Sequence, residues 1–98
     1  YIDDIISGTR SAIDYNYKNE VFNLGNNKSE KLMEVIGIIE SELRINAKIE
    51  SQELQMGDVI QTYADIDYSI QQLNYNPKAT IKKGIPKFVD WYKNYYNH

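Results

Sequence analysis

The stretch Val21–Ser51, VFNLGNNKSEKLMEVIGIIESELRINAKIES, decides the fold class that the sequence predicts. Its first residues are a short apolar run stopped by Gly25-Asn26-Asn27, as in a buried strand that enters a turn. Its middle carries one apolar helix face of about four turns, and its end alternates apolar and polar residues, as a strand with one wet face does. The helix face is Leu32, Val35, Ile36, Ile39 and Leu43, and the alternating residues are Ile45, Ala47 and Ile49. We therefore predict a strand over 21–24, a helix of about four turns that Ser29 or Asn27 can cap, and a strand over 45–51. A strand, helix, strand order usually pairs its strands in parallel by a right-handed crossover.

Three further helices are predicted outside this stretch. Helical spacing predicts one from about Asp4 to Asp14, with Asp3 or Asp4 capping its first turn. Asp65 can cap a short helix through Leu73, which the Asn74–Pro77 turn ends. The last helix follows a Thr80 cap, and its apolar residues step by four and three: Ile81, Ile85, Phe88, Tyr92 and Tyr95. The predicted fold class is α/β with a helical excess, about four helices and two or three short strands in one unit over 1–98.

Composition excludes several classes of function. The 98 residues include 11 Lys+Arg against 14 Asp+Glu, a formal charge of −3 that gives no footprint for a nucleic acid or an anionic membrane. With no Cys, the chain has no disulfide scaffold, zinc ribbon or catalytic thiol. Its longest apolar stretch, Val35–Ile39, is far shorter than the roughly 20 residues that span a bilayer. We expect one soluble domain that binds no polyanion.

Catalytic constellations are absent from the sequence. The single His is the final residue, His98, and we assign it no role. Capping explains the carboxylates of Asp3-Asp4 and of the Asp65/Asp67 pair better than metal binding or acid–base work does. The five glycines lack the spacing of a dinucleotide-binding or phosphate-cradling loop. We predict no catalytic residue, no metal site and no cofactor site within these residues.

Two polar or aromatic features leave alternatives open. In the loop Gln55-Met56-Gly57-Asp58, an amide and a carboxylate around a Gly could hold a sugar or a ribose, but the same residues also suit an ordinary turn in which Asp58 bonds its own backbone. The aromatic residues of the last helix favour a docking face over a stacking platform for bases, because no basic groove accompanies them. They are Trp91, Tyr92, Tyr95 and Tyr96.

The beginning of the chain and its Tyr content suggest a missing neighbour. The sequence starts at Tyr1 without Met, inside a periodic apolar segment, and it contains nine Tyr against two Phe and one Trp. Tyr suits half-buried surfaces, since its ring can be buried while its hydroxyl stays hydrated. We expect the chain to be cut from a longer protein.

Four motifs, taken in order, carry a resemblance to a known family. They are Tyr1-Ile2-Asp3-Asp4-Ile5, Val21-Phe22-Asn23-Leu24-Gly25-Asn26, Gln55-Met56-Gly57-Asp58-Val59 with Thr62-Tyr63-Ala64-Asp65, and Gly84 with Lys87-Phe88-Val89-Asp90-Trp91-Tyr92. In this order they resemble the C-terminal part of extended short-chain dehydrogenase/reductases. The likeness is closest to NAD-dependent nucleotide-sugar epimerases, and among them to UDP-glucuronate 4-epimerases of the capsular polysaccharide type.

The resemblance implies a two-part parent enzyme. Its N-terminal Rossmann domain would carry the Gly-rich NAD loop and a Tyr-x-x-x-Lys pair, and neither is present here. Residues 1–98 would be the C-terminal segment, a sheet-edge strand plus the substrate-binding subdomain. Asp58 matches the acidic position that accepts from the nucleotide ribose, and Gln55 falls where galactose epimerases have an Arg facing the diphosphate.

Expectations about activity and partners follow from the same resemblance. The parent would be a cytoplasmic isomerase that uses NAD and a UDP-sugar, UDP-glucuronate or UDP-galacturonate, for surface polysaccharide synthesis. The chain alone would be inactive, bind no NAD, and self-associate or form a homodimer where the Rossmann domain is missing. The alternatives are a nucleotide-sugar dehydratase or decarboxylase of the same superfamily, and a stand-alone helical interaction module.

Overall fold

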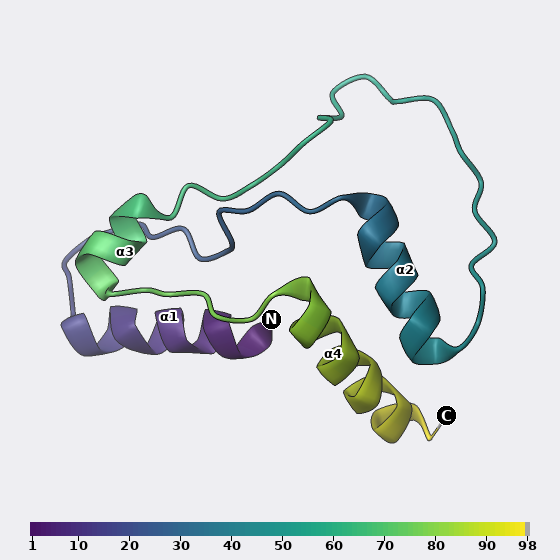
Figure 1. Ribbon diagram of the computed structural model, residues 1–98. Helices are drawn as coiled ribbons and strands as arrows, with labels where there is room; N and C mark the ends of the chain where they lie inside the picture. The colour runs from purple at the N-terminus through teal and green to yellow at the C-terminus, as the bar shows by residue number, and fades with distance from the viewer. Residues whose placement is uncertain (98) are drawn as a thin grey trace. The chain divides into compact units, whose positions relative to one another are not determined.

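The computed structural model describes residues 1–97 and contains four helices in this range (Figure 1). They are α1 (Ile2–Tyr15), α2 (Leu32–Leu43), α3 (Asp67–Leu73) and α4 (Ile81–Tyr96). Each lies where apolar residues recur at helical spacing, so the four predicted helices are confirmed. His98, to which we assign no role, lies outside the described residues.

The predicted α/β fold class is wrong, because residues 1–97 contain no strand. A strand needs a partner strand that pairs with its main-chain N–H and C=O groups. Segments 21–24 and 45–51 have no such partner within residues 1–97, so neither forms a sheet. Side chains take some of those groups instead. Ser69 Oγ donates to the carbonyl of Asn23 at 2.6 Å, and the N–H of Ala47 donates to Glu40 Oε1 at 2.6 Å. The described part of the chain is therefore all helical with irregular connections.

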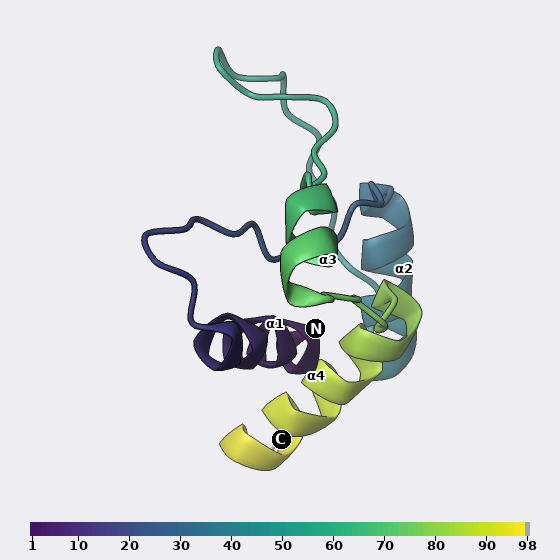
Figure 2. The same ribbon diagram turned by 90° about the vertical axis from the view of Figure 1, so that its left-hand side faces the viewer.

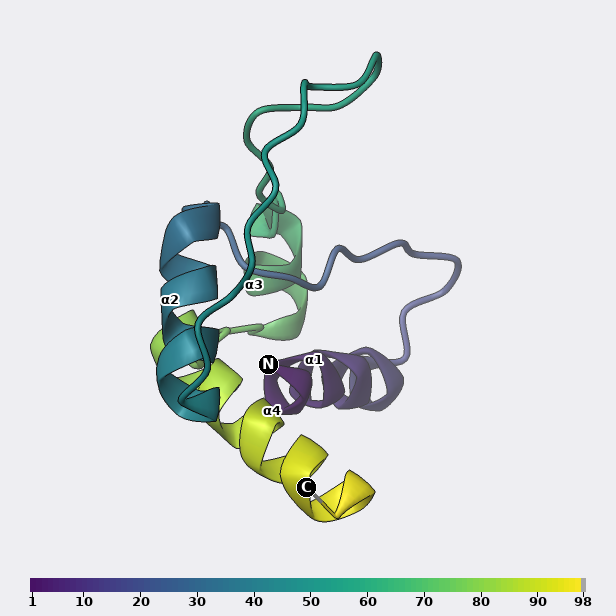
Figure 3. The same ribbon diagram turned by 90° about the vertical axis from the view of Figure 1, so that its right-hand side faces the viewer.

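The chain forms two compact units, each made of two separated stretches of sequence. Unit 1 comprises Tyr1–Ser29 and Tyr63–Thr80, and unit 2 comprises Glu30–Thr62 and the segment from Ile81 onward. Within unit 1, α1 packs with α3, and within unit 2, α2 packs with α4. Figures 2 and 3 show the connection between α2 and α3 as a long segment without a helix.

Unit 1 has a small core around α3. Ile66, Leu73 and Tyr75 are buried, and four partly buried side chains pack against them: Ala12, Phe22, Leu24 and Ala64. Gly8 lets α1 approach this core closely. A Cβ added at Gly8 would lie 2.6 Å from Leu24 Cδ2 and 3.0 Å from Tyr75 Cδ2.

Unit 2 is held together by the packing of α4 against α2. Gly84 and Val89 are the buried residues of α4, which runs continuously through Pro86. Lys93 Nζ donates to the carbonyl of Glu42 at 2.8 Å, near the C-terminus of α2. A cation at this end satisfies an unpaired carbonyl and complements the helix dipole. The contact therefore joins the ends of the two helices.

Candidate functional site

Residues 55–58 form a tight turn closed by two hydrogen bonds. The N–H of Asp58 donates to the carbonyl of Gln55 at 3.1 Å, and the N–H of Gln55 donates to Asp58 Oδ2 at 3.2 Å. Gly57, the third residue, has φ +92°, the positive value that a type II turn requires at this position. Asp58 thus lies in an ordinary turn in which its side chain binds the local main chain, one of the two alternatives that the sequence left open.

The turn is open to solvent, so it offers its polar groups outward. Gln55, Gly57 and Asp58 are exposed, and the side chain of Met56 is fully exposed, at 103%. An ionised carboxylate accepts up to about four hydrogen bonds, so the bond from Gln55 leaves Asp58 able to accept from a ligand's hydroxyls. The predicted site residues Gln55 and Asp58 are therefore brought together in one turn.

Two other family-like motifs meet inside unit 1. The N–H of Ala64 donates to the carbonyl of Asn26 at 3.0 Å, and Asn23 Nδ2 donates to the carbonyl of Asp65 at 3.1 Å. Tyr75 Oη adds a bond to the carbonyl of Gly25 at 2.9 Å. Segment 22–26 is thus fixed by main-chain and side-chain partners from 64–75. These partners take the place of the neighbouring strand that the predicted strand over 21–24 would need.

Asp4 does not cap the helix that contains it. Its Oδ1 accepts from the N–H of Lys78 at 3.0 Å and its Oδ2 from the N–H of Ala79 at 2.9 Å. The bond from Lys78 is the main reason that the pKa of Asp4 lies below its usual value, although partial burial opposes it. The predicted capping role is wrong, because α1 begins at Ile2 and Asp4 instead binds the segment before α4.

The second carboxylate pair has a local structural role. Asp65 Oδ1 accepts from the N–H of Asp67 at 3.2 Å, at the first residue of α3. Asp65 therefore satisfies an amide of that first turn, as predicted, although Ile66 stands at the N-cap position. No group of three or more potential metal ligands occurs among residues 1–97.

Two tyrosines of unit 1 have perturbed ionisation, and in both the shift opposes catalysis near neutral pH. Burial raises the pKa of Tyr75, and the negative charge of Asp4 adds to this effect. The hydrogen bond from Tyr68 Oη to Glu20 Oε2 raises the pKa of Tyr68. A tyrosine that acts as a base needs a lowered pKa, so neither shift favours that role.

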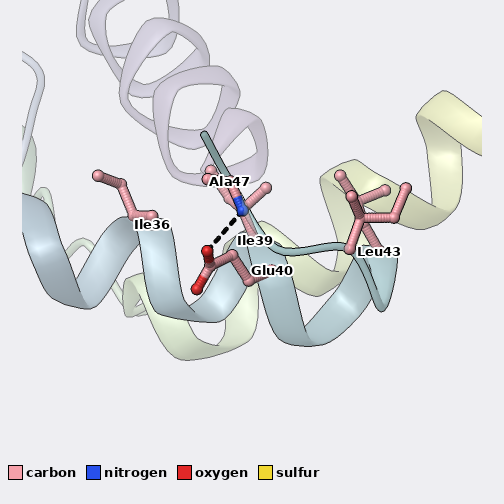
Figure 4. Close-up of a pocket in the computed structure, with 6 residues that line it drawn as sticks. Ile36, Ile39, Glu40, Leu43 and Ala47 are labelled. Carbon is pink, nitrogen blue, oxygen red and sulfur yellow. Dashed lines mark hydrogen bonds between the residues drawn. The ribbon is translucent and has the colours of Figure 1, made fainter. Parts of the chain in front are cut away.

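Unit 2 also contains an open apolar cavity of about 230 Å³ (Figure 4). It lies between α2 and the segment that follows it, and Glu40 reaches across to the N–H of Ala47. Its lining is Ile36, Ile39, Glu40, Leu43, Ile45 and Ala47. Gln55 and Asp58 do not line it, so the cavity and the turn are separate features.

Sequence reasoning assigned Asp4 the wrong hydrogen-bond partners, and it did not single out three other residues that hold these segments in place: Glu40, Ser69 and Tyr75. Their partners are 7 to 75 residues away in sequence, beyond the reach of capping or periodicity signals.

Comparison with known proteins finds relatives that align with nearly the whole chain. No family model matches it. It is 43% identical over 77 residues to Protein CapI of Staphylococcus aureus, covering 79% of this chain and 23% of that protein. It is also 33% identical over 111 aligned positions to UDP-glucuronate 4-epimerase 4 of Arabidopsis thaliana, covering 99% of this chain and 25% of that protein.

A solved structure is also similar to this chain. A UDP-glucuronic acid 4-epimerase mutant from Bacillus cereus, in complex with UDP-4-deoxy-4-fluoro-glucuronic acid and NAD, matches with a TM-score of 0.79 and 29% identity. The match covers 96% of this chain and 31% of that structure.

These findings define the chain as a part of a nucleotide-sugar epimerase-like protein. In particular, it is homologous to the UDP-glucuronate 4-epimerases and matches their C-terminal portion, which confirms the resemblance seen in the sequence. The chain spans between 23% and 28% of the length of the curated relatives it matches.

Proposed function

We propose that residues 1–98 form the nucleotide-sugar-binding segment of an NAD-dependent UDP-sugar 4-epimerase that interconverts UDP-glucuronate and UDP-galacturonate for surface polysaccharide synthesis. The observation that carries the proposal is the match of nearly the whole chain to an epimerase solved with NAD and a UDP-sugar analogue. In such an enzyme NAD accepts hydride from the sugar C4 hydroxyl carbon and returns it to the opposite face. This chain's own contribution is binding and orientation.

The turn at 55–58 supplies the proposed ligand contacts. Asp58 would accept from the ribose hydroxyls, because its carboxylate is exposed and is repelled by a diphosphate. Gln55 would donate its side-chain amide toward the diphosphate, without adding a charge. No Gly-rich turn of this chain suits a dinucleotide, so we assign NAD to the rest of the parent protein.

The rest of the parent protein is also the proposed partner of α1. One face of α1 packs into unit 1 through Gly8 and Ala12. A neighbouring face carries four isoleucines around the exposed Thr9, and each isoleucine is 36% to 72% exposed: Ile2, Ile5, Ile6 and Ile13. Aliphatic helix faces of this kind cover the sheets of α/β domains, so we propose that the missing Rossmann domain covers this face.

A chimeric enzyme tests this function. The C-terminal segment of the Bacillus cereus epimerase that aligns with this chain is replaced by residues 1–98, and conversion of UDP-glucuronate to UDP-galacturonate is measured. We expect the chimera to turn over, and the isolated chain to show no activity. A folded chimera that binds NAD but does not bind UDP-glucuronate contradicts the proposed function.

Asp58 can be tested in the same chimera. Asp58→Asn keeps a side-chain oxygen for the N–H of Gln55 but removes the charge, whereas Asp58→Ala removes both. We expect KM for UDP-glucuronate to rise about tenfold or more in Asp58→Ala and less in Asp58→Asn, with kcat nearly unchanged, because a lost hydrogen bond to a charged group costs about 1.5–3 kcal/mol. Glu53→Ala, an exposed carboxylate in the same segment, is the control. Equal KM values for Asp58→Ala and Glu53→Ala would exclude the assigned contact.

A further inference from the structure

The C-terminal half of α4 carries an exposed aromatic face. Neighbouring rings contact one another along it: Trp91 and Tyr95 lie 5.3 Å apart, and Tyr92 and Tyr96 lie 4.7 Å apart between ring centroids. Phe88 joins the same surface, 5.7 Å from Trp91. These five side chains are each 40% to 66% exposed, and we call them the aromatic face.

A different set of residues attaches α4 to its own unit. Gly84 and Val89 are buried, and Lys93 donates to the carbonyl of Glu42 on α2. The side chains of the aromatic face are therefore additional to these contacts, and each of them keeps a substantial fraction of its surface exposed.

Charge is distributed very unevenly between α4 and the rest of the chain. Helix α4 contains four lysines and one acidic residue, a net charge of +3, while the rest of the chain contains seven basic and thirteen acidic residues, a net charge of −6. The total of −3, from which we expected no membrane partner, conceals this separation. Lys83, Lys87 and Trp91 follow one another at spacings of four, so cations lie along the edge of the aromatic face.

We propose that α4 binds flat on an anionic lipid surface, with the aromatic face among the headgroups and its lysines against their negative charges. Amphipathic helices with a Lys-rich polar side and an aromatic apolar side bind bilayers in this way, and Trp and Tyr prefer the membrane–water interface. At about 24 Å for 16 residues, α4 has room to lie along such a surface. No helix in the described range is long and apolar enough to cross a membrane.

The side-chain chemistry favours lipid over a protein partner for this face. The exposed face of α1 carries four isoleucines and Thr9 and no aromatic side chain, as suits a dry protein contact. The aromatic face combines one indole N–H and three phenol hydroxyls with flanking lysines, as suits a hydrated, negatively charged surface. The proposal is independent of the epimerase function.

Trp91 is the single Trp of the chain, so its fluorescence reports directly on this face. The 98-residue chain is titrated with vesicles of phosphatidylcholine and with vesicles that also contain phosphatidylglycerol. We expect a blue shift of Trp91 emission and co-sedimentation with the anionic vesicles only, both reversed by salt. Lys83→Gln/Lys87→Gln should weaken binding about 30-fold, since each lysine near an anionic surface contributes about 1 kcal/mol.

The matched control is Lys28→Gln/Lys31→Gln, which removes the same charge from exposed lysines outside α4 and should leave binding unchanged within about twofold. Equal binding to neutral vesicles, equal loss in both double variants, or no binding overturns the proposal. A blue shift that depends on protein concentration without lipid also overturns it, because a second copy then covers the face. Circular dichroism of each variant shows that α4 is still folded.

Discussion

Asp4 links the start of the chain to the segment that precedes α4. Both of its oxygens accept main-chain N–H groups, from Lys78 and Ala79. The sequence places Asp4 where a helix cap is expected, and no local signal shows that its partners lie 74 and 75 residues away. The sequence predicted that the Asp4 carboxylate accepts hydrogen bonds from unpaired main-chain amides, but it did not predict which amides.

The two bonds of Asp4 make the stability of unit 1 depend on pH. Its pKa is lowered in the folded chain from the ordinary value of 3.8, so folding favours the charged form. This contribution is complete above the unfolded pKa and is lost as the pH falls from about 4 through the lower folded value. We expect Asp4→Asn to reduce the free energy of unfolding by about 1–2 kcal/mol at neutral pH and to flatten the loss below pH 4.

Urea denaturation as a function of pH measures this effect. The control is Asp14→Asn, whose carboxylate lies 3.5 Å from Arg10 in an exposed i, i+4 pair. An exposed pair contributes little, so this variant should stay within about 0.5 kcal/mol of the unchanged chain. If Asp4→Asn and Asp14→Asn behave alike, the Asp4 bonds do not stabilise the fold.

At the level of elements, we predict opposite effects on stability for the substitutions Gly8→Ala and Gly37→Ala. Both lie inside helices, where replacing Gly by Ala gains up to about 1 kcal/mol of helix propensity. At Gly8 the new Cβ meets Leu24 and Tyr75, whereas at Gly37 nothing lies within 4 Å. Thermal unfolding should show a net loss of about 1–2 kcal/mol for Gly8→Ala and a gain for Gly37→Ala. Stabilisation by both substitutions would show that α1 does not need its close approach to the core.

Helices were predictable from this sequence and strands were not, for a physical reason. A helix satisfies its own main-chain groups, so the spacing of Leu32 to Leu43 identifies α2 without knowledge of its neighbours. A strand needs a second strand. The alternation of Ile45, Ala47 and Ile49 describes a side-chain pattern, but within the described residues no partner completes it. The turn at 55–58 was recognisable because Gly57 and Asp58 act on their nearest neighbours.

For the molecule as a whole, we predict self-association of the isolated chain. The aliphatic face of α1 and the open cavity in unit 2 together expose much apolar surface, more than single scattered residues would. Sedimentation at increasing concentration should show dimers or larger species. Replacing Ile6 and Ile13 by Gln should shift this equilibrium toward the monomer, and a clean monomer at all concentrations for the unchanged chain would contradict the prediction.

The interleaving of the two units also has a consequence for how the chain is made. Each unit needs a second stretch of sequence that comes after part of the other, so the chain passes between them at 29/30, 62/63 and 80/81. No contiguous truncation can isolate either unit. During synthesis, residues 1–29 cannot complete unit 1 until residues 63–80 have been made, and Asp4 can bind the N–H of Ala79 only after the segment between them has been made.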